Sequence, residues 1–194
     1  MGLEILQTQP YLSYLLLPLW RWDARHKFSK LQQFLKPNQQ ILELGCGLGT
    51  VTDYFQQQGL TITPIDLKNL SLFPKIKPIV YDGKKIPFDD KTFDIVLLLT
   101  VLHHTMDVIK ILHEAQRVGN QIIIIEDIYD HKCQQYLTYG VDSLINFEFR
   151  KHPHNNRTDE QWHQLFNQLN LKINYTYSYS FLFFFKQVVY VLDC

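Results

Sequence analysis

The segment Ile41-Leu-Glu-Leu-Gly-Cys-Gly-Leu-Gly-Thr50 is the most informative part of this sequence. Its apolar residues predict a short buried strand. Glycines at alternate positions then break the strand, and helical spacing returns through Val51 and Phe55. A strand therefore runs through a tight turn into a helix. The glycines let a ligand approach the main chain closely, and the free N–H groups at the helix start favour an anionic or carboxylate-bearing ligand.

The spacing of this glycine turn leaves the ligand open. The dinucleotide-binding fingerprint is G-x-G-x-x-G, whereas this turn reads G-x-G-x-G and has Thr50 in the place of the third glycine. A glycine turn that only connects a strand to a helix is the structural alternative. The ligand must therefore be inferred from residues elsewhere in the chain.

Strands and helices alternate along the chain, which is typical of a parallel sheet covered on both faces. We expect strands at residues 41–44, 61–65, 76–81, 93–99 and 121–126. A helix with apolar i, i+3, i+4, i+7 spacing begins at Val108, and Thr158 opens another with a capping box. Ligands bind such sheets outside the carboxyl ends of the strands. These ends nominate the site residues Gly45, Asp66, Asp82, Thr100 and Glu126.

Four segments together resemble one enzyme family. Glu43–Gly49 resembles motif I of the class I S-adenosylmethionine-dependent methyltransferases, and Asp66 matches the acidic residue that this family places at the ribose. Asp82–Asp94 resembles the adenine-holding segment. Ile95–His104 is similar to the end of strand four in the quinone-methylating branch (methyltransferase type 11). The motifs occur in the family's order and cover about residues 38–127.

The resemblance implies both a fold and an activity. The fold would be a Rossmann-like α/β structure with a seven-stranded, mostly parallel, doubly wound sheet, helices on both faces, and a C-terminal antiparallel strand pair at 171–177 and 183–192. The activity would be methyl transfer from S-adenosylmethionine to a small-molecule, apolar or aromatic acceptor, with S-adenosylhomocysteine as product. We expect one domain, 1–194, with a helical or lid segment at 1–37 and an insertion at 128–157 on the substrate side.

Cofactor residues follow from the same resemblance. The methionine carboxylate suits the glycine turn and helix start, because an anion would meet free N–H groups. Asp66 would accept from the ribose hydroxyls, Asp82 from the adenine amine, and Glu43 would hold the methionine ammonium or orient the loop. The structural alternative for both aspartates is a strand-end turn or a helix cap. The cofactor-binding prediction comprises Glu43, Gly45, Cys46, Gly47, Asp66, Leu67, Asp82, Gly83 and Thr100.

Two histidines after the fourth strand are the candidates for acid–base chemistry. A base is needed only when the acceptor carries a proton that must leave. A neutral imidazole is available near pH 7, so His104 is the first candidate for this base and His103 the second. The alternative is that one of the two rings packs against the cofactor while the other caps the next helix.

Residues after strand five are predicted to contact the substrate. Arg157 could clamp a carboxylate or phosphate, and His154 could act as a second base. His152 and Glu126 complete this predicted substrate set. The alternative is a polar loop ordered by its own hydrogen bonds. No zinc pattern is present beyond His152-Pro-His154, so we predict no metal site.

The N-terminal segment has three readings. Asp23 is expected to cap a helix that continues through Phe28 and stops at Pro37. The apolar residues 1–20 would pack against the main domain, close as a lid over a lipophilic substrate, or contact a membrane surface peripherally. No stretch reaches the ~18 uncharged apolar residues of a membrane-spanning helix.

Composition excludes several classes of protein. The net charge is zero and the Lys and Arg residues are scattered, so nucleic acid is not an expected partner. The three cysteines are far apart and lack CxxC spacing, which favours a reducing cytoplasm over a disulfide framework. Two rival functions remain: an NAD(P)-dependent oxidoreductase, and a non-catalytic module that binds S-adenosylmethionine.

Overall fold

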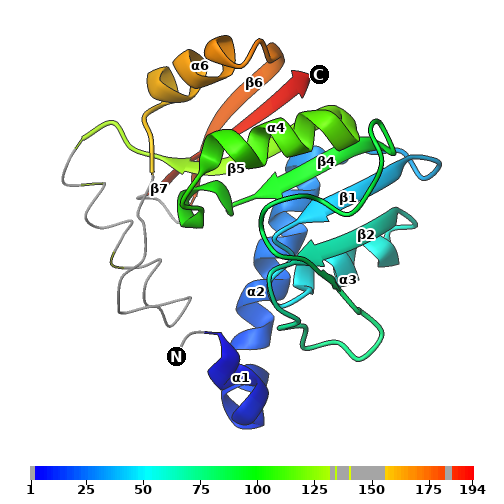
Figure 1. Cartoon of the computed structure of the whole chain (residues 1–194). Coiled ribbons are helices and arrows are strands. Elements are labelled where there is room, and N and C mark those ends of the chain that lie inside the picture. The colour runs from blue at the N-terminus through cyan, green and yellow to red at the C-terminus, as the bar shows by residue number, and fades with distance from the viewer. Residues whose placement is uncertain (1–2, 132–133, 135–139, 141–155, 182–184) are drawn as a thin grey trace.

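A seven-stranded sheet in the order β3-β2-β1-β4-β5-β7-β6 forms the centre of the computed structural model, which describes residues 3–131, 134, 140, 156–181 and 185–194 (Figure 1). Each pair from β3 to β5 is parallel, whereas β7 is antiparallel to both β5 and β6. The predicted fold class is therefore confirmed. The strands are β1 (Gln40–Leu44), β2 (Thr61–Asp66), β3 (Ile79–Val80), β4 (Phe93–Leu99), β5 (Gly119–Ile128), β6 (Lys172–Phe181) and β7 (Phe185–Asp193).

Helices cover both faces of this sheet. Side chains of α4 and α6 pack into one core, and side chains of α2 and α3 pack into the other (Figure 1). The isoleucine run of β5 serves both cores, because Ile122 and Ile124 point to the first and Ile123 and Ile125 to the second. The helices are α1 (Glu4–Thr8), α2 (Pro10–Leu31), α3 (Thr50–Gln57), α4 (Val108–Val118) and α6 (Asp159–Gln168).

Several predicted bounds differ from the structure, most clearly those of α2 and β3. Helix α2 begins at Pro10 and contains Pro18, so Asp23 lies inside the helix and does not cap it. A proline at the first turn is well tolerated because that N–H has no helical acceptor. Strand β3 covers only Ile79–Val80, since Pro78 cannot donate to a strand ladder. The capping box of α6 is confirmed in both of its hydrogen bonds.

The N-terminal hairpin of α1 and α2 packs against loops at the carboxyl ends of the strands. Leu6 and Trp20 form a buried cluster with Leu48, which belongs to the glycine turn. The Gln7 side chain donates to the carbonyl of Asn69 at 3.1 Å, in the loop after β2. The hairpin therefore covers the loops that follow β1 and β2. Within the described ranges, no helix has both the length and the apolar character needed to cross a bilayer.

Candidate functional site

The glycine turn is packed tightly on one side and open on the other. Gly45 has φ +79°, its N–H donates to the Ile65 carbonyl at 2.8 Å, and a methyl group on its Cα would come 2.3 Å from Cγ2 of Val101. Gly47 has φ +50°, and a methyl group there would meet nothing within 4 Å. Both positions favour glycine on conformational grounds. Open space at Gly47 is the room that a ligand on this loop requires.

Asp66, at the end of β2, fastens this turn. One carboxylate oxygen accepts from the N–H of Gly47 at 2.8 Å, and the other accepts from the N–H of Leu67 at 2.6 Å. These bonds tie the glycine turn to the carboxyl end of the neighbouring strand. Each carboxylate oxygen has a further lone pair. The prediction that Asp66 accepts from a ribose hydroxyl is compatible with this geometry and stays a prediction.

Glu43 lies beneath the turn and has almost no exposed surface. The Thr52 hydroxyl, in the first turn of α3, donates to its carboxylate, so Glu43 joins β1 to α3 across the glycine turn. Burial raises the pKa of Glu43 to about 7, against the Thr52 hydrogen bond and the charge of Lys27, which lower it. Of the two predicted roles, the contacts favour loop orientation.

Lys27 is a site residue that the sequence analysis missed. It lies on α2 with 6% of its surface exposed, and its Nζ is 2.8 Å from the Asp23 carboxylate and 3.0 Å from Oγ1 of Thr100. Thr100 follows β4 with the left-handed φ of +56°. A buried lysine requires paired partners, and these contacts supply them. The i, i+4 spacing of Asp23 and Lys27 was the only available signal.

Glu126 organises the turn that follows β4. One of its oxygens accepts from the N–H groups of Val101 and Leu102 at 2.9 and 2.7 Å, and the other lies 2.6 Å from Nδ1 of His103. Glu126 has 0% exposure. Glu126 therefore supports this turn, and its predicted contact with substrate stays a prediction.

His103 and His104 occupy different environments although they are adjacent in sequence. Both belong to the 3₁₀ turn Leu102–His104, and their ring centroids are 4.0 Å apart. His103 is buried against Glu126, whereas His104 is only half-buried. Since a proton acceptor must reach the substrate, His104 has the better position of the two.

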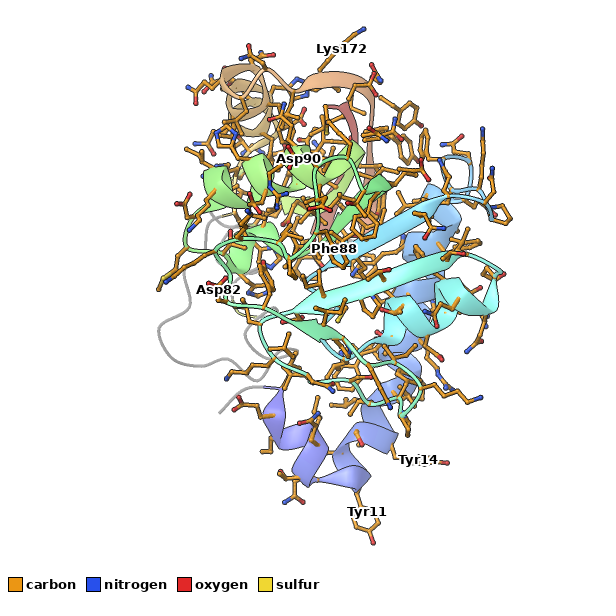
Figure 2. The ribbon with its side chains drawn as sticks, turned by 45° about the vertical axis from the view of Figure 1, so that its right-hand side comes forward. Tyr11, Tyr14, Asp82, Phe88, Asp90 and Lys172 are labelled. Atoms are coloured by element: carbon orange, nitrogen blue, oxygen red, sulfur yellow. The ribbon has the colours of Figure 1, made fainter. Side chains whose placement is uncertain are left out.

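Asp82 and Gly83 lie in the loop after β3. Asp82 accepts from the N–H groups of Lys84 and Lys85 at 2.8 and 3.3 Å, and these bonds lower the pKa of its carboxyl. The strand-end turn weighed as an alternative for this residue is thus present. A methyl group on Gly83 would come 2.9 Å from Leu67, so this loop lies directly against the residue after Asp66 (the position of Asp82 is labelled in Figure 2).

The remaining predicted residues lie around this edge or outside the described ranges. Cys46 is buried in the turn, and burial raises the pKa of its thiol. Arg157 bridges to Ile128 at the end of β5, with its guanidinium 5.0 Å from the Trp162 ring centre. Burial lowers the pKa of Arg157, against the opposing charge of Glu126. His152 and His154 lie outside the described residues, as does most of 128–157.

Among the described residues, no group of three or more His, Cys, Asp or Glu side chains is placed to hold a metal ion. The residues that converge at the carboxyl edge of the sheet are the glycine turn, Asp66, Asp82, Thr100 and the two histidines. Their donor set is backbone N–H groups, carboxylates and imidazoles, which suits an organic ligand with hydroxyl, amine and carboxylate groups.

Comparisons with known proteins find methyltransferases. Residues 42–121 match the family model described as a methyltransferase domain. The chain is 30% identical over 146 residues to the sterol 4-C-methyltransferase strm-1 of Caenorhabditis elegans, covering 61% of this chain and 43% of that protein. It is 31% identical over 100 residues to the demethylmenaquinone methyltransferase of Streptomyces griseus, covering 47% and 44%.

Solved structures share the fold at low identity. Magnesium protoporphyrin IX methyltransferase from Synechocystis PCC 6803, solved with bound S-adenosylhomocysteine, superposes with a TM-score of 0.63 and 13% identity, covering 90% of this chain and 83% of that one. The chain spans less than half the length of the curated relatives it matches.

Residues 42–121 are thus similar to a methyltransferase domain, and the whole chain has the fold of solved S-adenosylmethionine-dependent methyltransferases. The cofactor of those proteins is S-adenosylmethionine. The residues present fit that cofactor, because the open side of Gly47 lies beside the Asp66 carboxylate and the start of α3.

Proposed function

We propose that this chain transfers a methyl group from S-adenosylmethionine to a small apolar acceptor. The observation that carries the proposal is the hydrogen bond of 2.8 Å between the Gly47 N–H and Asp66. It fixes an open glycine turn beside a carboxylate, at the edge of the sheet where ligands bind. Bound S-adenosylmethionine would supply a methyl group already activated by a positively charged sulfur.

The chain's own residues would then bind, orient and exclude water. The start of α3 offers N–H groups to the methionine carboxylate, Asp66 accepts from the ribose hydroxyls, and Asp82 accepts from the adenine amine. Leu67, which follows Asp66, lies against Gly83, which follows Asp82. In-line transfer demands positioning and a dry site more than covalent help from the protein.

His104 would accept a proton from the acceptor if one must leave. Its half-buried ring belongs to the 3₁₀ turn that Glu126 stabilises by accepting two backbone hydrogen bonds. Glu126 and His103 are then positioning residues, since neither has more than 1% of its surface exposed. Arg157, at the end of β5, would meet a polar group of the acceptor, as we propose for His152 and His154.

The nature of the acceptor is proposed from the relatives and from exposed side chains. Two relatives are named for a sterol and for demethylmenaquinone, which are apolar molecules. Leu67 and Met106, which follow Asp66 and the histidine turn, are 57% and 89% exposed. Exposed apolar side chains beside a site favour an apolar ligand.

Calorimetric titration with S-adenosylhomocysteine, NAD and NADP tests the cofactor. We expect S-adenosylhomocysteine alone to bind, with a dissociation constant on the order of micromolar. Tight binding of NAD or NADP instead would establish the oxidoreductase rival. Turnover to S-adenosylhomocysteine with any lipophilic acceptor would exclude the non-catalytic module.

A matched pair of glycine variants tests the assignment to the turn. Gly47 and Gly59 both have positive φ, and neither would bring a methyl group within 4 Å of another atom. Gly47→Ala and Gly59→Ala should therefore lose similar stability, about 1 kcal/mol each. Only Gly47→Ala should weaken binding of S-adenosylhomocysteine, because Gly59 lies between α3 and the start of β2, at the amino ends of the strands. Equal affinity in both variants would contradict the assignment.

A further inference from the structure

The first half of α2 presents an apolar face that the fold leaves exposed. Tyr11, Tyr14, Leu15 and Leu19 are 88%, 82%, 73% and 42% exposed, and their spacing places them on one side of the helix. We call these four residues the apolar tip. Figure 2 shows Tyr11 and Tyr14 projecting from the lower end of the molecule, away from the sheet.

Anchoring of the hairpin does not use this face. A different side of α2 contributes Trp20, Leu12 and Leu16 to the cluster with Leu6 and Leu48. The helix is therefore apolar on two sides but buried on one only. A helix that is apolar all round is normally buried. The described residues do not cover the apolar tip, so we expect it to bind a partner.

The apolar tip contains no acidic residue, and its helix contacts a lysine-containing loop through Arg21. Arg21 is the only charged residue between 9 and 22, and its guanidinium is 5.6 Å from the Phe73 ring centre, in the loop after β2. That loop, 67–78, contains Lys68, Lys75 and Lys77 and no acidic residue. Glu4 of α1 pairs with Lys68 at 2.6 Å, while Lys75 and Lys77 are exposed. Arg21, two residues after Leu19, thus lies against the loop that contains these lysines.

We propose that the apolar tip docks this protein on the surface of an anionic lipid bilayer. Tyrosine rings suit the boundary between headgroups and acyl chains, because they have an apolar body and a polar end. Lysines next to an inserted helix attract anionic headgroups. A second protein or a second copy of the chain explains the apolar side chains but gives no reason for the adjacent cations. The proposal goes beyond methyl transfer and does not depend on it.

Co-sedimentation of the full chain with vesicles tests this surface. The vesicles are phosphatidylcholine alone, and phosphatidylcholine mixed with phosphatidylglycerol. We expect binding to the mixed vesicles that weakens as salt is added. The triple variant Tyr11→Ser, Tyr14→Ser, Leu15→Ser should bind them at least about tenfold more weakly. Lys75→Gln and Lys77→Gln should each weaken binding by about fivefold.

The matched control is Tyr175→Ser with Tyr177→Ser. These residues are 38% and 46% exposed on β6, the edge strand opposite β3, so their removal should leave vesicle binding unchanged. Retained binding of S-adenosylhomocysteine and an unchanged circular dichroism spectrum would show that the triple variant is folded. Equal vesicle binding by the triple variant and the parent chain would overturn the proposal, as would no binding at all. A dimer in sedimentation velocity that the triple variant abolishes would assign the face to a second copy.

Discussion

Gly45→Ala should distort the glycine turn on the side that packs against Val101, opposite the open side where we propose that the ligand binds. The backbone at Gly45 has φ +79°, and an alanine methyl would lie 2.3 Å from Cγ2 of Val101. Left-handed backbone costs a non-glycine residue about 1 kcal/mol. Overpacking against Val101 adds about 2 kcal/mol. We therefore expect a total loss of about 3 kcal/mol in the free energy of unfolding.

A double-mutant cycle separates these two contributions. Val101→Ala removes the closest atom, so that Gly45→Ala should cost only about 1 kcal/mol in that background, a coupling of about 2 kcal/mol. Urea unfolding, with the slope m checked for constancy, supplies all four free energies. Additive effects of the two substitutions would refute the steric reasoning. The Val101 N–H also donates to Glu126, so displacement of Val101 should slow turnover.

Three further outcomes are expected. Burial raises the pKa of Glu43 to about 7 from 4.5, so its contribution to the free energy of unfolding is full below pH 4.5 and is lost as pH rises through 7. Glu43→Gln should remove up to about 3 kcal/mol of this pH dependence, as measured by urea unfolding at several pH values. Lys27→Met should cost about 2 kcal/mol, because it leaves the Asp23 carboxylate without its partner, and thermal unfolding would measure the loss. Glu126→Gln should lower kcat by about tenfold and change the pH profile of turnover, since Glu126 acts through His103. The affinity for S-adenosylhomocysteine should stay within about threefold of the parent value. A parallel loss of affinity would contradict a positioning role.

Local patterns in the sequence were sufficient to predict most of the strands. β4 has the predicted bounds, Phe93–Leu99, because the apolar run Ile95–Leu99 is typical of a parallel strand that is buried on both faces. The capping box at Thr158 was predictable because its hydrogen bonds lie within one turn. The start of α2 was not, since Pro18 is a helix breaker by propensity, whereas the packing of Leu12 and Leu16 keeps the helix continuous through it.

The candidate site was predictable as a set of strand ends but not as a set of contacts. Asp66 was identified from its place after β2, yet its bond to the Gly47 N–H depends on how two neighbouring strands end. Lys27 was missed because its partner Thr100 is 73 residues away in sequence, and no periodic pattern encodes such a pair. Glu126 is predicted at the carboxyl end of β5, where it lies, but its burial follows from the turn that folds over it, which no local sequence pattern indicates.

The different environments of His103 and His104 follow from the same carboxylate. Glu126 binds two successive N–H groups, which tightens the chain after β4 into a 3₁₀ turn. His103 is directed inward to Glu126. The His104 ring lies against the His103 ring, with centroids 4.0 Å apart, and is itself half-buried. Exchange of the two roles would require the turn to unwind, and this is why we assign proton acceptance to His104 and not to the pair.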